Sequence, residues 1–111
     1  MIKVKRGDLW WTDLRTHVGH EQTKIRPTLV VSNDRMHTSG LTVVIPLTRT
    51  PGPMRAEIEN PALDTISYAQ ADQIRTVSVE RMSTYIGTAS GEQMSSVGRL
   101  LRYVLVLPER S

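Results

Sequence analysis

Cysteine is absent from this 111-residue chain, which excludes disulfide bonds and thiolate metal sites. The three histidines, His17, His20 and His37, lack the HExxH spacing of a zinc-binding helix, so we expect neither a metal nor a cofactor. No segment approaches the roughly 20 apolar residues that a membrane helix needs. The charged N-terminus is not followed by an apolar run of signal-peptide length. We therefore expect a cytoplasmic protein without membrane association.

Repeats, low-complexity tracts and linkers are also missing, and the length suits a single domain over residues 1–111. Hydrophobic residues make up 39% and charged residues 23%, which is typical of a globular protein with one modest core. The net charge of +3 is a mild excess that permits contact with nucleic acid without establishing it.

Six short segments predict strands, because apolar and β-branched residues gather in them and turn residues separate them. They are residues 9–14, 28–32, 41–47, 55–59, 67–77 and 84–88. The continuous apolar run at 28–32 predicts a strand buried on both faces. Strand alternation predicts that Thr48 points away from the apolar face that carries Leu47. Pro46 predicts that its strand lies at a sheet edge or ends there.

The C-terminal quarter changes to helical spacing. Ser90, with Gln93 three residues later, predicts a helix that starts with a capping box, and Pro108 marks its end. Its core-facing stripe comprises Met94, Val97, Leu101 and Val104, widened by Leu100 and Leu105, while Arg99 and Arg102 lie off it. Short strands followed by one terminal helix predict a mainly β fold, a small, partly open barrel with a C-terminal helix.

A polar segment runs directly into the buried strand at 28–32. It brings His20, Glu21, Lys24 and Arg26 to the mouth of a rigid element. An acid, a base and cations in this position suit chemistry on a phosphate, since the guanidinium presents a planar fork to phosphate oxygens. The alternative interpretation of Arg26 is a surface arginine that caps the start of the strand.

Several short motifs occur in a distinctive order along the chain. They are residues 6–11 (RGDLWW), 19–22 (GHEQ), 26–27 (RP), 30–34 (VVSND), 46–48 (PLT) and 72–76 (DQIRT). In this order the sequence resembles the MazF/PemK (Kid) family, toxins of type II toxin–antitoxin systems. The resemblance implies an SH3-like barrel with short helices that forms a homodimer. It also implies a sequence-specific endoribonuclease, or mRNA interferase, that cleaves single-stranded RNA and is inhibited by the flexible C-terminal segment of a cognate antitoxin.

Metal-independent cleavage of RNA needs a base for the 2′-hydroxyl proton, donors for the phosphate oxygens and an acid for the departing 5′-oxygen. The products are a 2′,3′-cyclic phosphate and a 5′-hydroxyl. The resemblance implies catalytic roles for Arg26 and, as in the MazF branch, for Thr48. Glu21 is a candidate base or a residue that orients Arg26. The alternative for Thr48 is an ordinary residue at a strand end.

Two further catalytic candidates follow from the PemK/Kid branch of the family. His20 and Asp72 match positions implicated there, and an imidazole can act as an acid or a base near neutral pH. That branch carries an arginine two residues before its aspartate, where this chain has Gln70. This departure favours the mechanism that uses Arg26 and Thr48. The alternative for a histidine such as His20 is simple solvation.

Candidate RNA-binding residues extend along the chain. Lys24, Arg49 and Arg75 would line the path of the phosphates together with Arg26, and Gln73 could contact a base edge. Trp10 and Trp11 are adjacent and face opposite sides of a strand, so one is expected in the core. We assign the other, Trp11, to base stacking, with packing as the alternative.

Two non-catalytic functions compete with this interpretation. Gyrase-poison toxins share the implied fold, but they act through a helix end that carries a tryptophan. This chain ends in Leu107-Pro108 and three polar residues without such a tryptophan, which disfavours that class. The other alternative is an SH3-like module that binds RNA without cleaving it.

Overall fold

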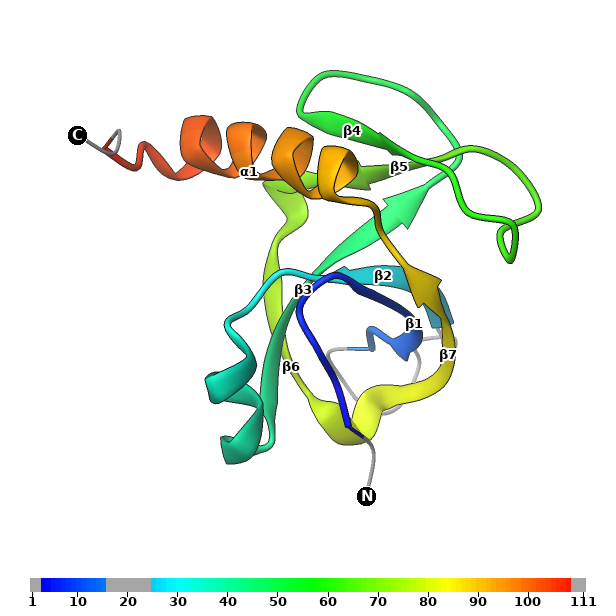
Figure 1. Cartoon of the computed structure of the whole chain (residues 1–111), viewed down its shortest axis with the longest axis vertical. Coiled ribbons are helices and arrows are strands. Elements are labelled where there is room, and N and C mark those ends of the chain that lie inside the picture. The colour runs from blue at the N-terminus through cyan, green and yellow to red at the C-terminus, as the bar shows by residue number, and fades with distance from the viewer. Residues whose placement is uncertain (1–2, 16–24, 109–111) are drawn as a thin grey trace.

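The computed structural model describes residues 3–15 and 25–108 and contains a strongly bent antiparallel sheet beside one long helix (Figure 1). Its seven strands are β1 (Asp8–Asp13), β2 (Ile25–Val30), β3 (Leu41–Thr48), β4 (Arg55–Ile58), β5 (Ser67–Gln70), β6 (Arg75–Ser78) and β7 (Met82–Thr88). The helix α1 spans Gly91–Leu105. Short 3-10 helices occupy η1 (Asp34–Ser39), η2 (Ala71–Gln73) and η3 (Val79–Arg81).

The described strands follow the order β4-β5-β3-β2-β1-β7, and β6 pairs with β3 outside this path. The two ends of the path, β4 and β7, are not paired with each other. The sheet is therefore a curved, incompletely closed barrel, and the predicted mainly β fold with a C-terminal helix is confirmed.

The strand β3 lies in the interior of the sheet, so of the two predictions from Pro46 the sheet edge is wrong, while the strand does end two residues later, at Thr48. Its partners on one side are β6, whose pairing reaches Val44, and β5, whose pairing with β3 begins at Leu47. The N–H and C=O of Val43 both bond to residues of the β2 side, so alternation directs the nitrogen of Pro46 to the opposite side. Pro46 thus falls between two partner strands, where a missing N–H interrupts neither of the two pairings.

The prediction of one strand over residues 67–77 is also wrong. The chain forms β5, turns through η2 and continues as β6, and both strands pair with β3. Because of this break, β5 and β6 pair with two successive parts of β3, which bends between them. Apolar residues lie on both sides of the break, so the sequence pattern did not indicate that the strand is interrupted.

Two apolar clusters occupy opposite faces of the sheet, because successive residues of one strand belong to different clusters. Leu29 and Val31 belong to the first, which α1 covers, and Val30 belongs to the second. This arrangement confirms that the run at 28–32 is buried on both faces. The second cluster also contains Trp10, which is 8% exposed.

The helix α1 begins with the predicted capping box. The Ser90 hydroxyl accepts a 3.1 Å hydrogen bond from the Gln93 N–H, and the Gln93 side-chain oxygen accepts one of 2.9 Å from the Ser90 N–H. Val97 is 1% exposed and packs into the first cluster with Met94, Leu100 and Leu101. Leu105 was predicted on the same stripe but is 47% exposed, because the last turns project past the sheet (Figure 1).

The helix ends at Leu105, before Pro108, through a left-handed residue. Val106 has a φ of 54°, and the Leu107 N–H donates to the Arg102 carbonyl at 2.9 Å, which is a Schellman-type closure. A β-branched side chain is strained in this conformation. Over the described part of the chain, the helices are too short or too polar to cross a membrane.

Candidate functional site

A cavity of about 380 Å³ opens where the ends of β1, β2 and β3 meet the connection between β4 and β5. Its apolar lining includes Trp11, Pro27 and Leu47, and its polar lining includes Arg26, Thr48 and Arg49. Four of the residues singled out from the sequence, Arg26, Thr48, Arg49 and Trp11, therefore line one cavity. An apolar surface with a few convergent polar groups is the usual character of a ligand site.

Antiparallel pairing explains how Arg26 and Thr48 meet. In the β2–β3 pair Thr28 lies opposite Pro46. Continuing this register by two residues sets Arg26 opposite Thr48, because each step forward on one strand is a step back on the other. Twenty-two positions apart in the sequence, the two residues line the same cavity near the ends of neighbouring strands.

The donors of these two residues are available to a ligand. Among the described residues, no hydrogen bond or ion pair engages the exposed Arg26 guanidinium. The Thr48 hydroxyl oxygen accepts a 3.3 Å hydrogen bond from the Thr50 N–H, which leaves its own proton to donate. Thr48 is half-buried and Leu47 fully buried, so the predicted opposite orientation of their side chains is confirmed.

Arg49 and Asp64 bring charge to the rim of the cavity. Their side chains are 75% and 90% exposed, and the Arg49 Nη2 lies 3.8 Å from the Asp64 Oδ2. An ion pair this exposed and this long contributes at most about 1 kcal/mol. A phosphate could therefore displace Asp64 from Arg49 at little cost.

One of the two adjacent tryptophans is buried and the other is exposed, as the alternation predicted. Trp10 is in the core, where its indole N–H donates to Asp8 at 3.1 Å and its ring meets Tyr85 edge-on at 5.6 Å between centroids. Trp11 is 39% exposed and lines the cavity. Its ring is thus accessible to a ligand base, and base stacking remains a prediction.

Three predicted residues lie away from the cavity lining. Asp72 and Gln73 are exposed on η2, at the turn between β5 and β6. Arg75 donates a 3.0 Å hydrogen bond from its guanidinium to the Leu14 carbonyl. The other predicted site residues, His20, Glu21 and Lys24, lie outside the described residues.

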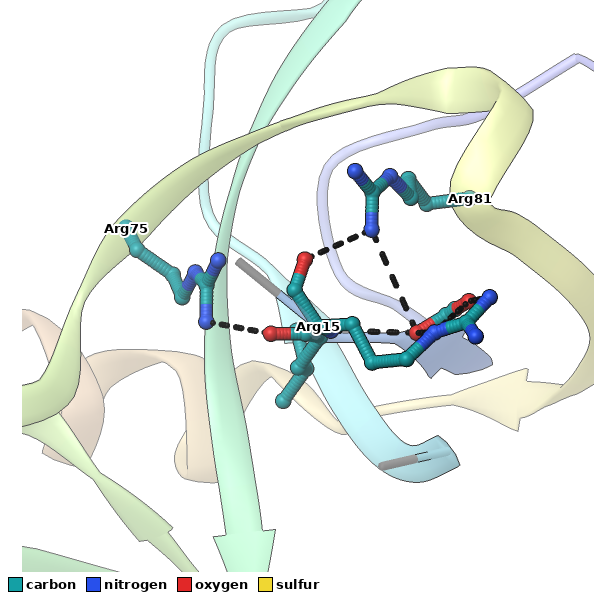
Figure 2. Close-up of polar contacts among 5 residues, drawn as sticks. Arg15, Arg75 and Arg81 are labelled. Atoms are coloured by element: carbon teal, nitrogen blue, oxygen red, sulfur yellow. Dashed lines mark hydrogen bonds and ion pairs between the residues drawn. The ribbon is translucent and has the colours of Figure 1, made fainter. Parts of the chain in front are cut away.

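The bond from Arg75 belongs to a cluster that holds the chain beyond β1 (Figure 2). Arg81 donates to the Arg15 carbonyl at 2.7 Å, and Arg15 bonds to the Asp13 carboxylate with its Nη2 at 2.7 Å. The hydrogen bonds from the Arg15 side chain are the main reason why the pKa of Asp13 lies below its ordinary 3.8. Two arginines from β6 and η3 thus fix successive backbone carbonyls at the end of β1.

One wall of the cavity was not found from the sequence. It comes from the connection between β4 and β5 and includes Leu63, Asp64 and Thr65. Turn-forming residues such as Asn60-Pro61 mark this stretch as a loop at the end of a strand. Its approach to Arg26 follows from the pairing of β5 with the end of β3, which no local signal reveals.

Comparison with known proteins agrees with this geometry. Residues 5–105 match the family described as the PemK-like, MazF-like toxin of type II toxin-antitoxin systems. Because the match spans most of the chain, this protein belongs to that family.

Individual relatives agree with the assignment. The chain is 30% identical to endoribonuclease MazF9 of Mycobacterium tuberculosis, over 94% of this chain and 98% of the relative. It is also 30% identical to endoribonuclease EndoA of Bacillus subtilis, over 94% and 96%. A mycobacterial endoribonuclease solved in complex with its cognate antitoxin superposes with a TM-score of 0.78 and 25% identity, covering 96% of this chain and 99% of the other.

Proposed function

We propose that this protein is the toxin of a type II toxin–antitoxin pair and cleaves single-stranded RNA without a metal ion. The observation that carries the proposal is that one cavity is lined by the Thr48 hydroxyl and by the Arg26 guanidinium, which no other described residue engages. The names of the relatives MazF9 and EndoA, both endoribonucleases, support the class of reaction.

The reaction is an in-line displacement at phosphorus. A base removes the proton of the ribose 2′-hydroxyl, the 2′-oxygen forms a bond to phosphorus, and the bond from phosphorus to the 5′-oxygen breaks. A proton from an acid then goes to the departing 5′-oxygen. The products are a 2′,3′-cyclic phosphate and a 5′-hydroxyl end.

Arg26 and Thr48 act on the charge that develops during this displacement. The planar guanidinium of Arg26 contacts two non-bridging phosphate oxygens at once, and it stays charged throughout. The Thr48 oxygen accepts a hydrogen bond from the Thr50 N–H, and its own proton is left to donate to a phosphate oxygen. Fixed donors of this kind are each worth roughly 10²–10³ in rate, so the pair supplies a large part of the acceleration.

We assign proton transfer to residues that are close to Arg26 in the sequence. We propose that one of Glu21 and His20 is the base and the other the acid, since both precede Arg26 by only a few residues. Asp72 is a weaker candidate, because it lies on η2 and outside the cavity lining. Lys24 and Arg49 bind flanking phosphates, and Trp11 stacks on a base.

We further propose that the protein acts as a homodimer in the bacterial cytoplasm, where mRNA is the substrate. A cognate antitoxin would inhibit it by covering the cavity at Arg26 and Thr48. The support for this partner is the related mycobacterial endoribonuclease, which was solved with its cognate antitoxin.

The decisive experiment incubates purified, antitoxin-free protein with a long single-stranded RNA in EDTA. We expect discrete fragments with cyclic-phosphate and 5′-hydroxyl ends, lost in Arg26→Ala and retained in the matched control Arg35→Ala. Arg35 is exposed and lies outside the cavity lining, so this control removes the same charge elsewhere. Intact RNA with folded wild-type protein would refute catalysis, and 5′-phosphate ends would refute the 2′-hydroxyl mechanism.

A further inference from the structure

A second, basic cavity lies between the segment before β1 and one face of α1. It has a volume of about 390 Å³ and is lined by Arg6, Met94, Ser95, Gly98, Arg99 and Arg102. None of these residues lines the cavity at Arg26. Three of the six are arginines and none is acidic, so the lining carries charge of one sign.

The three guanidinium groups are held in different ways. Arg6 donates to the Val31 carbonyl through Nη1, which ties its guanidinium to the end of β2 and leaves other N–H groups unused. Arg99 donates to the Ser96 hydroxyl at 3.1 Å. Within residues 3–15 and 25–108, no bond or ion pair engages the Arg102 side chain.

Among the described residues, no carboxylate forms an ion pair with the guanidinium groups of this cavity. The neighbouring carboxylate of Asp34 accepts a bond from the backbone N–H of Arg6, and none of the three guanidinium groups pairs with a carboxylate of the described chain. Lys5 adds a further exposed cation beside Arg6. A site with several unpaired guanidinium groups favours a ligand rich in phosphate, which arginine binds with two parallel hydrogen bonds.

Gly98 contributes no side chain to the lining of this cavity. It lies inside α1, where glycine is less favourable than alanine. A Cβ added to Gly98 would meet no atom within 4 Å, so internal packing does not require glycine at this position. Gly98 instead leaves the helix backbone open at the cavity, where a bulky ligand can approach closely.

A second copy of the chain fits this face less well than a polyanion does. A two-fold contact centred on Gly98 would bring Arg99 and Arg102 of both copies together, since such interfaces are self-complementary. Like charges placed opposite each other in an interface oppose association. The charge of the cavity therefore selects an anionic occupant.

We propose that this cavity is a secondary RNA site, which binds the phosphodiester backbone outside the cleavage cavity. The inference rests on the proposed function, because RNA is the polyanion that the protein would encounter as substrate. Arg99 and Arg102 contact phosphates, and Gly98 lets the strand lie against the helix. Long RNA gains affinity from these contacts, whereas an oligonucleotide confined to the cleavage cavity does not.

The test compares two substrates with the double variant Arg99→Ala/Arg102→Ala. One substrate is a short oligonucleotide just long enough to be cleaved, and the other is an RNA longer than the 44 Å dimension of the chain. We expect kcat/KM for long RNA to fall about tenfold, with kcat/KM for the short substrate unchanged. Arg35→Ala, with its charge outside both cavities, should change neither value.

Binding of non-cleavable RNA to catalytically inactive Arg26→Ala protein provides a separate readout. The slope of log affinity against log salt should become shallower by roughly 1.4 in the double variant, about 0.7 for each lost phosphate contact. Gly98→Ala should raise Tm by a few degrees and still weaken binding of long RNA. A stabilised variant with reduced affinity cannot be explained by misfolding.

The outcomes separate the two proposals. If wild-type protein cleaves neither substrate, the proposed function fails, while the binding measurements still test the cavity. Equal effects of the double variant on short and long RNA, or no effect on either, would overturn the secondary site. So would unchanged RNA affinity combined with weaker binding of the cognate antitoxin or a changed oligomeric state in sedimentation.

Discussion

Arg26 and Thr48 each lie two residues beyond the last pair of β2 and β3, Thr28 and Pro46, and continuing that register sets them opposite each other. Both line the cavity, and the Thr50 N–H already engages the Thr48 oxygen. One cavity thus carries both a cation and a hydroxyl proton that can be donated.

Replacement of Arg26 by lysine tests the planar fork. Lysine keeps the charge but presents a single ammonium group in place of two parallel N–H donors. We expect kcat on a single-stranded oligonucleotide to fall about 100-fold, with Tm unchanged because the side chain is exposed. A wild-type kcat for Arg26→Lys would show that charge alone suffices.

Thr48→Val and Thr48→Ser form a matched pair for the hydroxyl. Valine keeps the shape and removes the donor, so kcat should fall about 10- to 100-fold. Serine keeps the donor and should retain most of the activity. Single-turnover cleavage rates check both variants, and equal losses in the two would assign Thr48 a packing role.

Trp11 is expected to act in binding. Stacking on a base is worth roughly 1–3 kcal/mol, so Trp11→Ala should raise KM about 5- to 150-fold with a smaller change in kcat. Trp11→Phe retains an aromatic face and should recover most of the affinity. Steady-state kinetics on one oligonucleotide measures both values, and an unchanged KM in Trp11→Ala would exclude stacking.

The Asp13 carboxylate should make stability depend on acid pH. Because its pKa is lowered in the folded state, its contribution is present above the ordinary value of 3.8 and is lost as the pH falls through the lowered value. Urea midpoints should show wild type more stable than Asp13→Asn at pH 7, with the difference shrinking toward pH 3. A difference that does not depend on pH would assign the effect to neutral hydrogen bonds.

Val106 should limit the stability of the helix end. Its left-handed conformation costs a non-glycine residue roughly 1–2 kcal/mol, and the side chain is 85% exposed. Val106→Gly should therefore raise Tm by about 4 °C, since about 1 kcal/mol corresponds to that shift in a domain of this size. Val106→Ala retains a Cβ and should gain much less in thermal unfolding.

Most of the fold was predicted from signals that act over a few residues: strand alternation, turn residues and helix caps. Alternation predicted that one of Trp10 and Trp11 lies in the core, where the structure has Trp10, and the spacing of Ser90 and Gln93 predicted the start of α1. The turn at η2 escaped prediction, because it depends on how β3 bends between two partner strands. The interior position of the strand that carries Pro46 escaped prediction for the same reason.

The candidate site could likewise be predicted only in part. The resemblance carried by local motifs singled out Arg26 and Thr48, and the β2–β3 register places them together. The same motifs suggested a phosphate-binding role for Arg75, whose guanidinium donates one hydrogen bond to the Leu14 carbonyl, and that role stays a prediction. The contribution of Asp64 to the cavity required the pairing of strands distant in the sequence, which composition and spacing do not encode.

The arginine cluster at the end of β1 also bears on how the strand that carries Arg26 is held. Arg75 and Arg81 hold the backbone of residues 14 and 15, and strand pairing sets Thr12 opposite Arg26 and Asp13 opposite Ile25. The backbone position of Arg26 therefore rests on its pairing with β1, which contacts from β6 and η3 hold at its end. Replacement of His20 or Glu21 should then change proton transfer and leave the backbone of Arg26 in place, which would separate the two parts of the proposed chemistry.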